Sequence, residues 1–74
     1  MKAEFKDGDR VWYHPIINRM PRFAGVVDGD PWRLGGRDVV DLRDMEPAYS
    51  EYLGRDKKRV NAASFDALGK DVLL

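Results

Sequence analysis

The stretch Lys6-Asp7-Gly8-Asp9-Arg10-Val11-Trp12-Tyr13-His14-Pro15 decides the fold that this sequence favours. Its opening Lys-Asp-Gly-Asp is typical of a tight turn, because Gly adopts unusual backbone angles and Asp side chains accept hydrogen bonds from local amides. From residue 10 to residue 14 the side chains alternate, which predicts a β-strand with Val11 and Tyr13 buried and Trp12 facing outward. Pro15 ends this strand.

The chain continues as short apolar runs separated by turn residues. Phe23 to Asp28 is predicted to form a second strand that stops at the turn residues 28–31. Trp32 to Leu34 is expected to begin a return strand, with a bend at Gly35-Gly36. Arg37 to Arg43 is then the third strand. Together these runs predict an antiparallel meander.

The second half of the chain is more mixed. Residues 44–59 fit either a short helix, with Pro47 in its first turn and Gly54 as its stop, or one arm of a hairpin. Residues 57–62 predict a strand centred on Val60. Residues 64–69 predict one helical turn capped by Ser64, and the tail 70–74 either frays or forms the last edge.

Composition agrees with one small β domain over residues 1–74. Ten Asp stand against three Glu, and seven Gly and four Pro supply turns. The formal net charge of zero argues against long-range attraction to nucleic acid or an anionic membrane. The absence of Cys excludes disulfides and suits the cytoplasm. The expected core consists of Phe5, Val11, Tyr13, Phe23, Val26, Val40, Leu42, Val60, Phe65 and Leu68.

Four segments resemble the SH3-like small β-barrels: residues 5–11, Gly25-Val26-Val27, residues 39–42 and residues 60–65. The resemblance implies a mostly β, antiparallel small barrel with one or two short helical turns. This fold hosts binding modules of many kinds and one enzyme family, the type II dihydrofolate reductases. Val60-Asn61-Ala62-Ala63 lies where that family has its Val-Gln-Ile-Tyr active-site strand, so the catalytic side chains are missing.

One apolar surface is the first candidate site. An outward-facing Trp12 buries too little area to be explained by core packing. With apolar residues of the first loop and a second Trp it predicts a protein contact surface formed by Trp12, Ile16, Ile17, Met20 and Trp32, with Arg19, Arg22 and Arg33 at the rim. The alternative is that the loop folds over the barrel and hides Trp12 within the monomer.

The basic run of residues 55–59 is the second candidate site. Its cations, Arg55, Lys57, Lys58 and Arg59, together with an aromatic ring could contact phosphates and bases, although a solvated hairpin tip explains the same charges.

Catalytic and metal sites have less basis in the sequence. The single His14 fits a strand end, Ser64 fits a helix cap, and the acids Asp38, Asp41, Asp44 and Glu46 match no metal-binding loop. We therefore expect no catalytic residues, no metal and no cofactor.

The sequence thus predicts a non-catalytic binding or assembly module that contacts a protein partner or a second copy of itself. A nucleic-acid-binding module is the second hypothesis, and an oligomeric small-molecule enzyme of the type II reductase kind is the third. No membrane association is expected. The size and composition suit an accessory protein of a phage or other mobile element.

Overall fold

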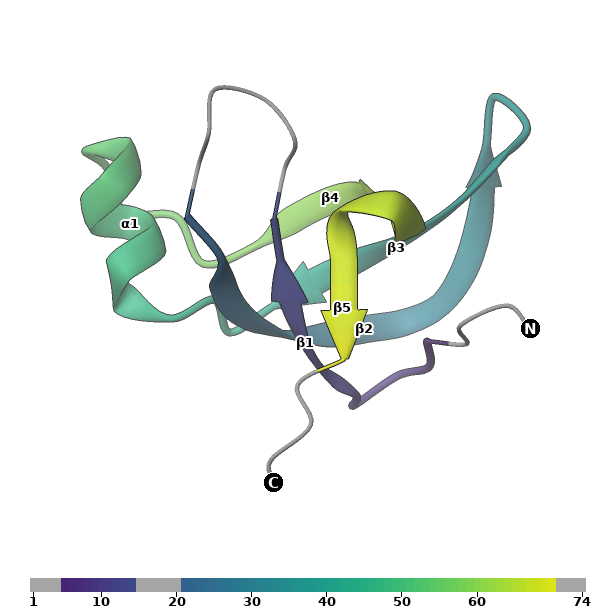
Figure 1. Cartoon of the computed structure of the whole chain (residues 1–74), viewed down its shortest axis with the longest axis horizontal. Helices are drawn as coiled ribbons and strands as arrows, with labels where there is room; N and C mark the ends of the chain where they lie inside the picture. Colours follow the sequence, from purple (N-terminus) through teal and green to yellow (C-terminus); the bar gives the residue numbers. More distant parts are fainter. Residues whose placement is uncertain (1–4, 15–20, 71–74) are drawn as a thin grey trace.

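The chain forms one curved antiparallel sheet of five strands in the order β4-β3-β2-β1-β5 (Figure 1). The computed structural model describes residues 5–14 and 21–70. The predicted mostly β, antiparallel fold with one or two helical turns is confirmed. The elements are β1 (Arg10–Tyr13), β2 (Phe23–Leu34), β3 (Arg37–Arg43), α1 (Pro47–Leu53), β4 (Val60–Ser64), the 3-10 turn η1 (Phe65–Ala67) and β5 (Leu68–Lys70).

The predicted stop at residues 28–31 is wrong, because β2 continues through them to Leu34. Asp28 pairs with Asp41 and Trp32 pairs with Val39, so residues 29–31 stand opposite a single residue of β3. The turn-forming residues therefore make a bulge, which bends the strand without ending it. The segment 32–34 belongs to β2, while the turn at residues 35–36 and the bounds of β3 agree with the prediction.

The core lies on the concave face of the sheet. Six of the expected residues are buried, and Tyr13, Phe65 and Leu68 are partly buried against them. The prediction that Val26 belongs to the core is wrong. The alternation of β2 that buries Phe23 also buries Val27. Val26 therefore lies on the outer face, between Arg10 and Arg43. The buried cluster is Phe5, Val11, Phe23, Val27, Val40, Leu42, Met45, Tyr49, Val60 and Ala63.

Residues 44–59 contain a helix, as one of the two alternatives predicted. Pro47 occupies its first turn, and Gly54 ends it with a left-handed φ of 73°, donating its N–H to the carbonyl of Ser50. Tyr49 is buried, with its ring centroid 5.2 Å from that of Phe23. Burial raises the pKa of Tyr49 and of Tyr13 above the ordinary value. No helix in the described part of the chain is long and apolar enough to cross a bilayer.

The strand predicted over residues 57–62 begins later, at Val60. Lys57 is held by α1 instead: its N–H donates to Ser50 Oγ at 2.9 Å, and the same hydroxyl donates to the Lys57 carbonyl at 2.8 Å. The predicted cap at Ser64 is confirmed, since its Oγ accepts the Asp66 N–H at 3.3 Å.

Asp41 stabilises an irregular point in β4 from the outer face of the sheet. One oxygen, Oδ1, accepts the Ala62 N–H at 3.0 Å and the Trp32 indole N–H at 3.3 Å. Ala62 has a φ of +56°, in the left-handed region that costs a non-glycine residue about 1 kcal/mol. The carboxylate thus holds a strained bulge in place.

Replacing Asp41 with Ala is expected to lower the free energy of unfolding by about 1–2 kcal/mol, because the Ala62 N–H loses its acceptor. Ala62→Gly is expected to raise it by about 1 kcal/mol, because Gly adopts positive φ without strain. Urea denaturation of both variants measures the two effects. Opposite signs are required, and a stabilising Asp41→Ala would refute this role.

Candidate functional site

Trp12 lies on the outer face of the sheet, as the alternation of β1 predicted. Its cross-strand neighbours are Ala24 on β2 and Gly69 on β5, two of the smallest residues available. Because neither neighbour has a side chain long enough to cover an indole, the Trp12 ring stands next to open space on this face. The side chain is half-buried.

A groove of about 320 Å³ opens beside this ring, between β1 and the η1–β5 segment. The two sides are tied together where β1 ends, because the His14 N–H donates to the Ala67 carbonyl at 2.7 Å. The lining residues are Trp12, His14, Arg22, Asp66, Ala67, Leu68, Gly69 and Lys70.

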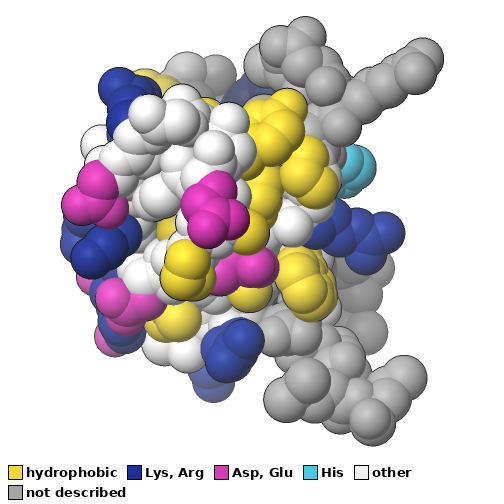
Figure 2. All heavy atoms as spheres, turned by 90° about the vertical axis from the view of Figure 1, so that its left-hand side faces the viewer, with side chains coloured by type: hydrophobic (Ala, Val, Ile, Leu, Met, Phe, Trp, Pro, Cys, Tyr) yellow, Lys and Arg dark blue, Asp and Glu magenta, His cyan; other side chains and the backbone are white. Residues whose placement is uncertain are grey.

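The groove combines an apolar wall with a mostly basic rim. The half-buried Trp12 ring forms the wall, and the exposed His14 and Arg22 lie at the rim, whereas the Leu68 side chain packs against the core. Figure 2 shows the His side chain at the right-hand edge of that view, next to a basic side chain. Asp66 is the single acid among the lining residues.

The two cations among the lining residues differ in position, because Lys70 pairs with buried Val11 and so points to the core face of the sheet. Lys70 Nζ lies 3.7 Å from Asp9 Oδ2 and 5.8 Å from the centroid of the Phe5 ring. For Arg22, no ion pair is formed within residues 5–14 and 21–70. Arg22 is therefore the cation of this rim best placed to meet an anionic ligand.

Neither the backbone conformation nor close packing requires glycine at position 69. Its φ is outside the left-handed region, and a Cβ built at this position meets no atom within 4 Å. A glycine inside a strand costs roughly 0.5–1 kcal/mol relative to Ala, so the position gives up stability. By contrast, a Cβ at Gly25 would clash with Met45 Sδ, so the packing of this side chain requires glycine there. Of these two strand glycines, Gly69 is the one beside open space.

The predicted apolar surface is divided in the structure. Trp12 pairs with Ala24 of β2, whereas Trp32 lies eight residues beyond Ala24 in the same strand, roughly 26 Å along the chain. Trp32 is 41% exposed, and its indole N–H is engaged by Asp41. The two indoles therefore belong to separate places on the outer face. The remaining members of the predicted surface, Ile16, Ile17 and Met20, lie outside the described residues.

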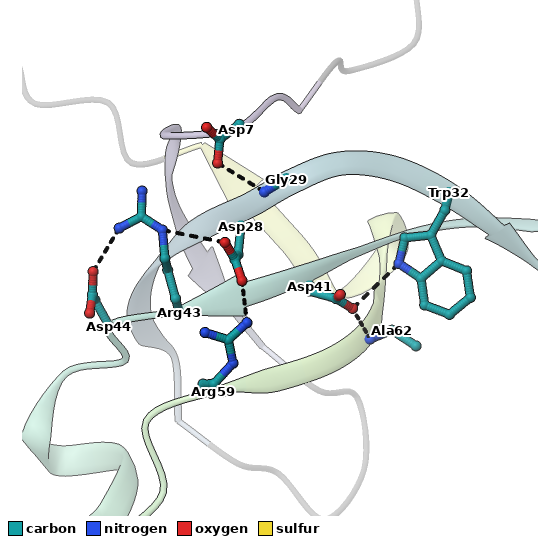
Figure 3. Close-up of polar contacts among 9 residues, drawn as sticks. All are labelled: Asp7, Asp28, Gly29, Trp32, Asp41, Arg43, Asp44, Arg59 and Ala62. Carbon is teal, nitrogen blue, oxygen red and sulfur yellow. Dashed lines mark hydrogen bonds and ion pairs between the residues drawn. The ribbon is translucent and has the colours of Figure 1, made fainter.

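The basic run of residues 55–59 is partly neutralised. Arg59 donates to one oxygen of Asp28, while the other oxygen lies 3.7 Å from Arg43 Nε (Figure 3). Arg43 also donates to Asp44 at 2.8 Å. Lys57 is half-buried, which leaves Arg55 and Lys58 as the exposed cations outside this network. The network reduces the charge that this segment can offer to phosphates.

The side chains that could act as a nucleophile or a base are far apart in the fold or already hydrogen-bonded. The Ser50 hydroxyl is engaged by Lys57, the Ser64 hydroxyl accepts from Asp66, and His14 lies on the groove. Among the described residues, no three His, Asp or Glu side chains come close enough together to hold a metal ion.

Arg22, predicted at the rim of the apolar surface, lines the groove, whereas sequence reasoning missed Gly69. No family model, curated protein or solved structure matches this chain. A function must therefore be argued from the chemistry of the groove itself.

Proposed function

We propose that this chain is a non-catalytic binding module that holds an acidic segment of a protein partner in the groove beside Trp12. The observation that carries the proposal is the combination of an accessible indole wall with His14 and Arg22 at the exposed rim. Aromatic and Arg side chains are enriched where proteins contact one another. The Arg22 guanidinium complements a carboxylate and favours its approach.

A protein segment fits this groove better than nucleic acid does. The formal net charge is zero, and Arg59 of the basic run is paired with Asp28. Both facts lower the electrostatic attraction on which non-specific nucleic-acid binding depends.

Arg22→Glu is expected to weaken binding of a fluorescently labelled probe peptide, acetyl-Glu-Asp-Leu-Asp-Glu-amide, by about tenfold, equivalent to about 1.4 kcal/mol. The physical reason is that attraction between the guanidinium and the probe's carboxylates becomes repulsion. Fluorescence anisotropy at low ionic strength measures the change, and added salt should weaken wild-type binding as well.

Arg37→Glu is the matched control. It makes the same charge change at an exposed position at the start of β3, away from the groove. It should bind the probe within about twofold of wild type. Equal loss in both variants would mean that net charge, and not the groove, attracts the peptide. Tighter binding of single-stranded oligothymidylate, or a mass that doubles with concentration unless Trp12 is replaced by Glu, would also overturn the proposal.

A further inference from the structure

The outer face around Trp12 has a gap that folding alone does not explain. In the cross-strand row formed by Ala24, Trp12 and Gly69, the indole is the only large side chain. A Cβ at Gly69 would enter open space, so Ala or a β-branched residue would fit there and would favour the strand. Glycine in a strand often marks a place where a ligand comes close to the backbone.

The walls of this gap are apolar close to the backbone and charged further out. The Trp12 ring lies on β1 beside the bare Gly69 backbone of β5, whereas Leu68 pairs with Tyr13 and packs against the core on the opposite face. His14 and Arg22 lie on the exposed rim of the same groove. Its volume of about 320 Å³ is at the lower end of ligand pockets, roughly 300–1,000 Å³, so it suits one large side chain better than an entire small molecule.

We infer that Gly69 is a specificity-determining residue, leaving room for one large apolar side chain of the bound segment to pack over the β5 backbone against the Trp12 ring. This inference rests on the proposed function and adds to it the identity of the anchor. Carboxylates on either side of the anchor would then meet Arg22 and His14. A ligand with acids alone would gain the charge attraction but leave the gap unfilled.

The test uses a series of probe peptides, acetyl-Glu-Asp-X-Asp-Glu-amide, in which X is Trp, Leu, Ala or Gly. Wild-type protein should bind the Trp and Leu peptides at least about tenfold more tightly than the Gly peptide, because burying a large apolar side chain contributes about 1.5–3 kcal/mol. Gly69→Val should reduce this ratio to about twofold or less, since the valine side chain occupies the gap.

Two measurements separate loss of the gap from loss of the fold. Gly69→Val should keep or raise the melting temperature, because its Cβ meets no atom within 4 Å and valine favours a strand. Asn61→Val places the same side chain at an exposed position of β4, the opposite edge strand, and should leave the peptide preference unchanged.

The outcomes distinguish the inference from the proposed function. Equal affinity for all X, lost on Arg22→Glu, would overturn the apolar anchor while leaving an acidic-segment site in place. A wild-type preference that survives in folded Gly69→Val would also overturn it, because the anchor would lie elsewhere. Absence of binding by every acidic peptide would overturn the proposed function and the inference together.

Discussion

Replacing Glu46 with Ala is expected to lower the free energy of unfolding by about 2–3 kcal/mol. Glu46 is the residue that attaches the start of α1 to the sheet. Its Oε2 accepts the Ala24 N–H at 2.6 Å, and its own N–H donates to the Ala24 carbonyl at 3.0 Å. Removing the carboxylate leaves the part-buried Ala24 N–H without an acceptor. An unsatisfied buried donor costs its full desolvation free energy, which exceeds the net contribution of an average hydrogen bond.

Urea denaturation of three variants makes this prediction specific. Glu46→Gln keeps an acceptor oxygen and should lose less than half of what Glu46→Ala loses. Glu51→Ala removes an exposed carboxylate from α1 and should change stability by no more than about 0.5 kcal/mol. If Glu46→Ala is no more destabilised than Glu51→Ala, Glu46 does not attach the helix.

Gly25→Val is expected to be the most destabilising of the single changes considered, at about 3 kcal/mol. A Cβ at Gly25 already clashes with Met45 Sδ, and the two further methyl groups of Val must enter the same filled region. Met45 is itself 5% exposed, so its thioether has little room to withdraw. The core must expand or the strand must shift.

Gly69→Val is the natural control, because both glycines lie in strands without a left-handed φ. Differential scanning calorimetry should show a large fall in melting temperature for Gly25→Val and none for Gly69→Val. Comparable losses of melting temperature at the two positions would contradict this prediction. They would mean that backbone preference, and not the contact with Met45, determines the cost of replacing glycine.

Local sequence patterns identified the elements whose formation depends on neighbouring residues. Alternation placed Val11 inside and Trp12 outside, and the Pro47 and Gly54 signals marked the helix. The bulge at residues 29–31 could not be recognised in this way, because Asp-Gly-Asp-Pro has the composition of a turn. Only the pairing of β2 with β3 on both sides of it shows that the strand continues.

The candidate groove was only partly predictable for a similar reason. Trp12 was identified because one strand's alternation suffices to place it. Its neighbour Gly69 comes from the other end of the chain, and only the β1–β5 register brings the two together. The sequence places Trp12 and Trp32 on one surface because it predicts a turn at residues 28–31. In the structure β2 continues through these residues and separates the two indoles.

The most direct test of the account is a map of ¹⁵N–¹H chemical shifts while the acidic Leu probe peptide is added to the full chain. We expect saturable changes at the Trp12 indole N–H, at His14 and Arg22, and along residues 66–70, with residues 55–59 and the Trp32 indole unaffected. Changes confined to the basic run or to Trp32, or no changes at millimolar peptide, would contradict a binding site at the Trp12 groove.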